Sequence, residues 1–357
     1  MRVLYFGTYE REYPRNAQVI SCLHRAGVEV LERHVAVWDG RRDNWRAGAR
    51  TAARLAAAEL RLLRRPDVEC DAVVVGYPGH LDLPAARRAA RGRPVVFNPL
   101  VSLSDTFVAD RGRFRSGSPA ARALALVDRH ALRAADLVVA DTHANADHLA
   151  ALATLPRDRV EVAFVGAEER VFGPGWAPVE PFTVLFVGKL IPLHGVETVL
   201  AAAGTAPELR FRLVGSGQLE HLVRARPANV DWLPWVEYER LPSELHGAGC
   251  ALGIFGTSGK ARRVIPNKAF QALACGTPLV TADTPAAREL LVDGESALLV
   301  PPGDPGALAA ALRRLATEPD TAGGIGAGGR AAYEARASEE VLGRRWRSLL
   351  ERELERR

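Results

Sequence analysis

The sequence has little of what marks disulfide-stapled, secreted or membrane-spanning proteins. Its 357 residues include one methionine and four cysteines, Cys22, Cys70, Cys250 and Cys275, with no C-x-x-C pair. This spacing argues against a disulfide framework and for free thiols in a reducing compartment. No apolar run reaches the roughly 18 residues that span a bilayer, and the chain opens on an apolar strand without a cleavable signal pattern. We expect a soluble, cytoplasmic protein, or one attached peripherally to the inner membrane face.

A strong excess of charge of either sign is also lacking. The chain has 47 Lys and Arg against 42 Asp and Glu, a formal net charge of +5. So small an excess fits an ordinary basic enzyme with an anionic ligand better than a nucleic-acid binder, so we expect no nucleic-acid partner. Apolar residues make up 48% of the chain, enough for packed cores, and the length fits about two domains.

Short apolar runs alternate with helical patterns in the first half. The predicted strands are 2–6, 28–33, 71–75, 94–97, 136–140 and 160–165, and helices are predicted at 17–26 and 46–64. Continuous apolar strands at this spacing are typical of a parallel sheet covered by helices on both faces. We therefore predict a doubly wound α/β domain over residues 1–172.

The stretch 173–181 is rich in Gly and Pro and has no periodicity, which predicts a linker. The α/β alternation then restarts and predicts a second doubly wound domain over residues 182–330. Its predicted strands are 183–187, 210–214, 230–233, 250–254, 279–281 and 297–300, and its predicted helices are 195–203, 241–247, 268–274, 285–292 and 306–316.

The glycine-rich run 323–329 is predicted to separate this second domain from a final helical segment, 331–357. Leu342, Trp346, Leu349 and Leu350 form an apolar stripe on that segment at helical spacing. We expect the stripe to dock, and the segment to cross back to the first domain.

The run from Val264 to Thr281 carries the most chemistry. Pro266 and Asn267 suit the first turn of a helix, where unpaired amides and the helix dipole favour an anion. Lys268 adds a cation at the same end, where it does not help the helix, so a bound anion would explain it. The alternative is an ordinary helix start with a stray lysine.

Two further strand ends in the same half reduce the weight of that alternative. Gly188 and Lys189 follow one predicted strand, with His194 and Gly195 before the next helix. Phosphates bind at such places in α/β folds, and the two cations could meet one diphosphate. A second turn, formed by Gly215, Ser216 and Gly217, lets the backbone approach a ligand.

From Phe186 to Gly303 the sequence resembles the donor-binding domain of family 4 retaining glycosyltransferases, which have the GT-B fold. The family's E-A-L-A-x-G-x-P-V-V motif is similar to the ten residues from Gln271 to Val280, its P-E-x-(V/I) motif to those at 288–290, and its L-V-P-P-G-D motif to the segment ending at Asp304. The resemblance covers about a third of the chain closely. It implies two Rossmann-like domains that face a central cleft, with a nucleotide-diphosphate sugar held by the second domain.

Four positions depart from the family pattern. Arg263 and Gln271 stand where the family carries two glutamates seven residues apart. Gln271 keeps a side chain that can hydrogen-bond a ribose hydroxyl, whereas Arg263 cannot replace a carboxylate, although it could hold a phosphate. Lys189 replaces an arginine and His194 replaces a lysine. The chain is therefore identified as a variant lacking the usual glutamate pair, and the sugar cannot be carried over.

The resemblance implies transfer of a sugar, with retention, from a nucleotide-diphosphate donor to a hydroxyl acceptor. The donor is a co-substrate, so no cofactor is expected, and no D-x-D pair at a strand end indicates a metal. A metal-independent site must stabilise the leaving diphosphate with cations and helix amides. We predict Lys189 and Lys268 as catalytic, and Trp235 as a contact to the base or as ordinary packing.

The first half is expected to supply the acceptor site. Gly7 and Thr8 follow the first strand and are predicted to approach the donor phosphates. The acceptor-side candidates follow other strands or end that first loop: Arg15, Asn16, His80, Asp110 and Arg111. A family histidine aligns with nothing here, and Asp105 or His80 could replace it; of the two, Asp105 is predicted to be catalytic. Asp105 and His80 could equally be loop caps.

Several alternatives stay open at this stage. The acceptor could be a glycan, a lipid-linked molecule or a small molecule, and the oligomeric state is open. The basic helix 46–65 could rest on an anionic membrane or present a solvated face. Other functions are a nucleotide-sugar epimerase of the same fold and a non-catalytic partner subunit. A Rossmann dehydrogenase is disfavoured because Gly7-Thr-Tyr9 is not a G-x-G-x-x-G loop.

Overall fold

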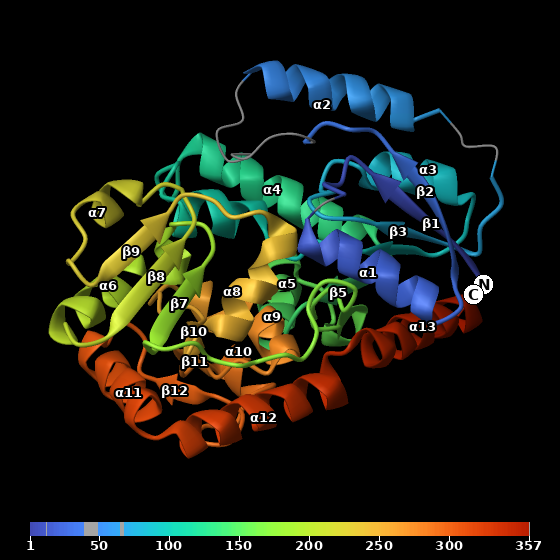
Figure 1. The fold of residues 1–357 in the computed structure, drawn as a ribbon. Helices are drawn as coiled ribbons and strands as arrows, with labels where there is room; N and C mark the ends of the chain where they lie inside the picture. Colours follow the sequence, from blue (N-terminus) through green and yellow to red (C-terminus); the bar gives the residue numbers. More distant parts are fainter. Residues whose placement is uncertain (12, 39–48, 65–67, 357) are drawn as a thin grey trace. The chain divides into compact units, whose positions relative to one another are not determined.

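A computed structural model describes residues 1–11, 13–38, 49–64 and 68–356. The chain divides into two compact units. Unit 1 comprises Met1–Val165 together with Glu339–Arg357, and unit 2 comprises Gly166–Ser338. Figure 1 shows the elements of both units, which are described here one at a time. Within the described residues, no helix combines the length and the apolar character needed to cross a membrane.

Unit 1 is built on one parallel sheet. Its strands are β1 (Arg2–Gly7), β2 (Glu29–His34), β3 (Ala72–Val75), β4 (Val95–Phe97), β5 (Leu137–Ala140) and β6 (Val160–Val162). Its helices are α1 (Pro14–Arg25), α2 (Ala49–Leu62), α3 (Leu83–Ala90), α4 (Pro119–Ala134), α5 (His143–Ala153) and α13 (Glu339–Glu355), and Asp105–Asp110 forms a π-helical turn. The strand order is β2-β1-β3-β4-β5-β6, so the direction of winding reverses between β1 and β3.

Unit 2 repeats this plan. Its strands are β7 (Thr183–Val187), β8 (Arg210–Val214), β9 (Val230–Leu233), β10 (Cys250–Leu252), β11 (Leu279–Ala282) and β12 (Leu298–Val300). Its helices are α6 (Val196–Thr205), α7 (Glu220–Arg224), α8 (Leu241–Gly247), α9 (Asn267–Cys275), α10 (Pro285–Arg288), α11 (Pro305–Thr317) and α12 (Pro319–Arg336). The order β12-β11-β10-β7-β8-β9 is that of a Rossmann sheet, and its winding reverses between β7 and β10.

Both sheets confirm the predicted α/β class, and the central strands are buried on both faces. β3 and β5 have four buried residues each, as does β11 in unit 2. Helices therefore cover both faces, as continuous apolar strands indicate. A separate hydrophobic core lies in each unit, around Phe6 and Phe97 in unit 1 and around Phe186 and Phe211 in unit 2.

The division between the units differs from the predicted linker at 173–181. The amides of Gly175, Ala177 and Val179 donate to carbonyls of Cys275, His246 and Gly247, all in unit 2. The Gly and Pro residues therefore make an irregular arm that is hydrogen-bonded to unit 2, and unit 2 begins at Gly166. A stretch rich in glycine and proline indicates irregular backbone, but such a stretch can belong to a domain and need not link two domains.

The glycine-rich run 323–329 is also not the predicted break, because it lies inside α12. A Cβ atom at Gly326 would overlap the carbonyl oxygen of Gly276, and one at Gly328 would overlap that of Glu295. The glycines thus let α12 lie directly on the backbone of neighbouring segments. The final helix, α13, begins at Glu339 and packs on α1 within unit 1 (Figure 1), with Trp346, Leu349 and Leu350 buried.

Candidate functional site

The start of α9 carries a buried lysine amine that has no hydrogen-bond partner. Pro266 precedes the helix in an extended conformation and gives it no side-chain cap. Lys268, in the first turn, is 8% exposed. Its Nζ has no hydrogen-bond partner and lies 3.5 Å from the centre of the Phe186 ring. Burial lowers the pKa of Lys268 well below its ordinary value. Keeping this buried amine charged costs free energy, and a bound anion would offset that cost.

The loop after β7 approaches this lysine. Gly188 has a φ of +144°, a conformation that favours glycine, and a Cβ there would lie 3.0 Å from the Nζ of Lys268 and 3.2 Å from Cε1 of His194. His194 Nδ1 lies 2.5 Å from the carbonyl oxygen of Lys189. The structure thus brings two predicted residues, Gly188 and His194, together beside Lys268, and the side chain of Lys189 is exposed in the same loop.

The position of this cluster follows from the topology of unit 2. The winding of the sheet reverses between β7 and β10, and ligands of open α/β sheets bind beyond the carboxyl ends of the strands at that reversal. The loop from Gly188 follows β7, and α9 follows β10. The cluster therefore occupies the place in unit 2 where this fold class binds ligands.

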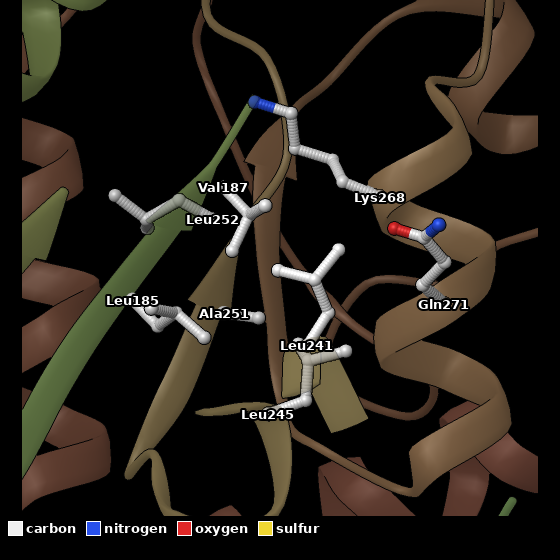
Figure 2. Close-up of a pocket in the computed structure, with 8 residues that line it drawn as sticks. All are labelled: Leu185, Val187, Leu241, Leu245, Ala251, Leu252, Lys268 and Gln271. Atoms are coloured by element: carbon white, nitrogen blue, oxygen red, sulfur yellow. The ribbon is translucent and has the colours of Figure 1, made fainter. Parts of the chain in front are cut away.

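A small cavity lies beneath Lys268 and Gln271 (Figure 2). Its volume is about 10 Å³, and it is lined by side chains of β7, α8, β10 and α9: Leu185, Val187, Leu241, Leu245, Ala251, Leu252, Lys268 and Gln271. Six of these eight side chains are leucine or valine or alanine on strands and α8. The two polar side chains both come from α9, one turn apart, and Gln271 is 7% exposed.

The turn from Gly215 to Gly217 has a packing role in the structure. A Cβ at Gly215 would overlap the carbonyl oxygen of Gly188, and one at Gly217 would lie 2.7 Å from that of Leu190. The amide of Leu190 donates to the carbonyl of Ser216. These glycines therefore allow two strand-end loops to lie against each other and support the Gly188 loop, while Ser216 is exposed.

Arg263 and Trp235 lie further along the same unit. Arg263 ends a 3₁₀ turn, Ala261–Arg263, and is half-buried. Trp235 is 52% exposed, and its Nε1 donates to Oε1 of Glu237 at 3.4 Å. So much exposed aromatic surface does not fit core packing, which leaves the ring accessible. Gly195, also predicted, ends the turn Pro192–His194 and precedes α6.

In unit 1 the predicted phosphate contacts of Gly7 and Thr8 are already occupied. The amide of Thr8 donates to Oδ2 of Asp82 at 2.6 Å, and its hydroxyl lies 3.1 Å from Oδ1. Asp82 is fully buried. Because this internal carboxylate takes the amide that a phosphate would need, the structure does not offer the Gly7 loop as an anion site. The sequence analysis did not single out Asp82, although it stands seven residues after the end of β3.

Arg15 and Asn16 are structural, contrary to the prediction that they face an acceptor. Arg15 is 0% exposed and donates to Oδ1 of Asn98 and to the carbonyls of Ala163 and Phe164. Asn16 bonds Tyr5 and the backbone of Tyr77 within the core. Both lie in the first turn of α1, which begins at Pro14 and not at residue 17, and this early start turns them inward.

His80 is likewise buried. Its Nε2 lies 3.4 Å from Oδ1 of Asp128, and its ring meets Phe97 edge-on. Burial lowers the pKa of His80, against the opposing charge of Asp128. Asp128 also accepts the amides of Leu103 and Ser104 and so caps the segment that follows β4. His80 therefore has the loop-capping surroundings that the sequence left as an alternative.

The remaining acceptor-side candidates lie on the segment after β4. Asp105 opens the π-helical turn and is half-buried, whereas Asp110 closes it and is buried, 3.7 Å from Nε of Arg111. Of the two carboxylates predicted in unit 1, Asp105 is more exposed than Asp110. Within the described ranges, no group of three or more His, Cys, Asp or Glu side chains could hold a metal ion.

Comparison with known proteins agrees with this geometry. Residues 181–318 match the family model of group 1 glycosyl transferases. D-inositol 3-phosphate glycosyltransferase from Acidothermus cellulolyticus is 32% identical over 210 residues, which cover 51% of this chain and 46% of that protein. The enzyme of the same name from Thermobispora bispora is 27% identical over 59% of this chain and 54% of its own. The chain thus spans about half the length of these curated relatives.

Two solved structures match nearly the whole chain. Sucrose-phosphate synthase from Thermosynechococcus elongatus has a TM-score of 0.77 at 18% identity and covers 98% of both chains. Anabaena Alr3699/HepE in complex with UDP and glucose has a TM-score of 0.71 at 16% identity, covering 98% of this chain and 99% of that one. The chain therefore has the two-Rossmann-unit fold of GT-B glycosyltransferases, and residues 181–318 are similar to group 1 glycosyl transferases.

Proposed function

We propose that this protein transfers a sugar from a nucleoside diphosphate donor to a hydroxyl acceptor, with the donor held by unit 2. The observation that carries the proposal is the buried, unpartnered amine of Lys268 at the start of α9, beside Gly188 and His194. A diphosphate placed there would neutralise the amine and meet the amide end of the helix.

The same residues would serve the chemistry. Negative charge grows on the leaving diphosphate in the transition state, and a preorganised cation in a poorly solvated site stabilises that charge strongly. Lys268 supplies the cation, and Lys189 lies in the adjoining loop. With His194 Nδ1–H donating to the carbonyl of Lys189, its Nε2 can donate to a phosphate oxygen when the ring is protonated.

Three finer features belong to the same proposal. Leaving-group stabilisation by lysines and helix amides would make transfer metal-independent, and the resemblance to family 4 implies retention. UDP complexes of Alr3699/HepE support a nucleotide donor, and the relatives named for D-inositol 3-phosphate support a hydroxyl acceptor. The acceptor class stays a glycan, lipid-linked or small-molecule alcohol, and Asp105 is our candidate catalytic carboxylate in unit 1.

Thermal-shift measurements against UDP-, GDP-, ADP- and dTDP-sugars, with NAD as control, test the proposal. We expect stabilisation by at least one nucleoside diphosphate sugar and by its free nucleoside diphosphate. Stabilisation by NAD with no response to any nucleoside diphosphate would overturn it. The departures from the family pattern at Arg263 and Gln271 also suggest a non-catalytic subunit. Slow hydrolysis of the donor without an acceptor would show that the protein is an enzyme instead.

A further inference from the structure

Helices α2, α3 and α4 form one layer on unit 1. α2 contacts α3, and α3 contacts α4. The strand order makes the chain connections through these three helices run in one direction across the sheet, whereas the connection through α1 runs in the other. Because such crossovers are right-handed, α1 lies on the opposite face of the sheet, where it packs on α13 (Figure 1). Unit 1 therefore has two helical faces that can be compared.

The outer surface of the α2–α3–α4 layer is basic and has no exposed acidic side chain. Within residues 49–64, 83–90 and 119–134 the two acidic residues are Asp128, which is buried, and Glu59, which is half-buried. The exposed charged side chains of these ranges are all arginines: Arg50, Arg54, Arg61, Arg64, Arg87, Arg88, Arg122 and Arg133. Among the described residues, Arg87 alone of these forms an ion pair, with Asp136 at 2.6 Å. The other seven arginines have no acidic partner there.

Exposed leucines lie among these arginines. Leu60 on α2 and Leu126 on α4 are 69% and 59% exposed. Leu63 and Leu81, beside the ends of α2 and α3, are 39% and 46% exposed. Arginines and leucines on one helical surface are typical of proteins that lie in a membrane interface, where apolar side chains enter the acyl boundary and arginines meet lipid phosphates.

The opposite helical face of unit 1 is charged differently. On α13, Arg347 pairs with Glu351 at 2.7 Å, and Arg352 pairs with Glu161 of β6 at 2.9 Å. These arginines are neutralised within the protein. The chain is rich in arginine on both faces, so its composition alone does not explain why the α2–α3–α4 layer lacks acidic partners.

The arginines and leucines together favour one occupant for this surface. Two copies of the chain that met through it would bring like charges together, which disfavours a self-complementary interface. A nucleic acid would attract the arginines but would leave the leucines without a partner. An anionic bilayer satisfies both, since its surface potential attracts basic side chains and its acyl boundary accepts apolar ones.

We propose that the outer surface of α2, α3 and α4 docks unit 1 on an anionic lipid bilayer. The arginines supply the attraction to lipid headgroups, and the exposed leucines enter the boundary between headgroups and acyl chains. The docking surface belongs to unit 1 and does not rest on the donor site proposed in unit 2.

Sedimentation with lipid vesicles tests the proposal. The protein is mixed with vesicles of equal parts phosphatidylglycerol and phosphatidylcholine, and with vesicles of phosphatidylcholine alone. We expect binding to the mixed vesicles that weakens as salt is added, and little binding to phosphatidylcholine. A variant that combines Arg50→Gln, Arg54→Gln and Arg61→Gln should bind the mixed vesicles on the order of 100-fold more weakly, about fivefold for each arginine.

Two further variants separate docking from a general effect of charge. Arg344→Gln, Arg347→Gln and Arg356→Gln together remove the same charge from exposed positions on or beside α13 and should change vesicle binding by no more than about twofold. Leu60→Gln with Leu126→Gln keeps every charge and should weaken vesicle binding about 10-fold. All three variants should unfold at the denaturant concentration of the wild type, because the replaced side chains are exposed.

Each outcome decides a point. A wild type that does not bind the mixed vesicles, or that binds phosphatidylcholine equally well, would overturn the proposal. An equal loss of binding in the α13 variant would show that net charge is sufficient, and wild-type binding by the leucine variant would show a polyanion site instead of a membrane surface. Calorimetry with nucleoside diphosphates on the same proteins tests the proposed function separately, since none of these substitutions lies in unit 2.

Discussion

The loops after β1 and β7 occupy the same topological position in the two units and have opposite electrostatics. Each follows the strand at which the winding of its sheet reverses, and each begins with a glycine of positive φ, +130° at Gly7 and +144° at Gly188. In unit 1 the loop is closed by the buried carboxylate of Asp82. In unit 2 it faces the buried amine of Lys268, which has no hydrogen-bond partner.

This electrostatic difference favours the loop of unit 2 as the phosphate site, a distinction that the fold shared by both units could not make. An anion approaching the Gly7 loop would meet a fixed negative charge and an amide already in use, whereas one approaching Gly188 would meet a cation in need of a partner. Two Rossmann-like units in one chain are therefore not interchangeable as phosphate sites. In our proposal, one internal side chain that faces each loop from another segment, Asp82 in unit 1 and Lys268 in unit 2, decides which loop can bind a phosphate.

Replacing Gly7 or Gly188 by alanine should give the largest difference between the two loops, in stability and in nucleotide binding. A Cβ at Gly7 would overlap the buried carboxylate of Asp82, so Gly7→Ala should lower the free energy of unfolding by about 3 kcal/mol or more. At Gly188 the nearest atom is the flexible end of Lys268, 3.0 Å away. Gly188→Ala should therefore cost about 1–2 kcal/mol, mainly from backbone strain, and also weaken nucleotide binding.

Denaturant unfolding of both variants measures the first effect and calorimetry with nucleotides the second. Equal losses of stability, or nucleotide binding that is damaged only by Gly7→Ala, would mean that the closed and open loops have been assigned the wrong way round.

Lys268→Met should separate binding from stability. Removing the cation should weaken binding of nucleoside diphosphates by about 10- to 100-fold, the range for a charged hydrogen bond. The ligand-free variant should nevertheless be more stable than the wild type, by about 1 kcal/mol, because a buried amine without a partner is replaced by an apolar chain of similar length.

Lys260→Met is the matched control for stability. Lys260 is 6% exposed in the same unit but has an interaction partner, so its replacement should destabilise the ligand-free protein. Lower stability in Lys268→Met, with unchanged nucleotide affinity, would show that the amine is an ordinary part of the core.

The closed loop of unit 1 should have a pH signature. Burial and the hydrogen bond and charge of Asp82 raise the pKa of Glu59, on α2, to about 9. Between its ordinary pKa, about 4.3, and about 9, the folded protein binds a proton that the unfolded chain has lost. The free energy of unfolding should therefore fall as pH rises through this window. One proton contributes at most about 1.4 kcal/mol per pH unit, reduced by solvent screening at this half-buried site.

Glu59→Gln should flatten that slope, because the amide needs no proton to donate to Asp82. Urea unfolding at several pH values between 5 and 9 measures the effect, with the two proteins converging at the acid end. Parallel curves for wild type and Glu59→Gln would show that Glu59 is not held protonated beside Asp82.

Sequence patterns predicted the strands well because burial on both faces leaves continuous apolar runs. β7, β8 and β9 have the predicted bounds, and α9 begins within one residue of its prediction. The cluster around Lys268 could also be predicted from the sequence, since a lysine at the start of a helix does not stabilise the helix. Helices α3, α4 and α5 were not predicted. Weak periodicity explains this only for α5, because α3 and the 16-residue α4 each have a clear apolar face.

What the sequence could not show is which polar side chains are turned inward. Arg15, Asn16 and His80 follow strands or end loops, as ligand-binding residues do, yet hydrogen bonds to distant segments hold each of them in the core. The basic helix predicted at 46–65 is described as α2 only over Ala49–Leu62, and residues 46–48 and 65 lie outside the described residues. Its membrane contact stays a prediction.

The glycines of α12 have a consequence for the order of folding. Five glycines in this 18-residue helix would cost about 4–5 kcal/mol relative to alanine, so the segment has no reason to be helical before its partner surface exists. That surface is the backbone at Gly276 and at 295–296, which comes together only once α9, β11 and β12 have formed. We therefore expect α12 to form late in the folding of unit 2 and to contribute little to its folding nucleus.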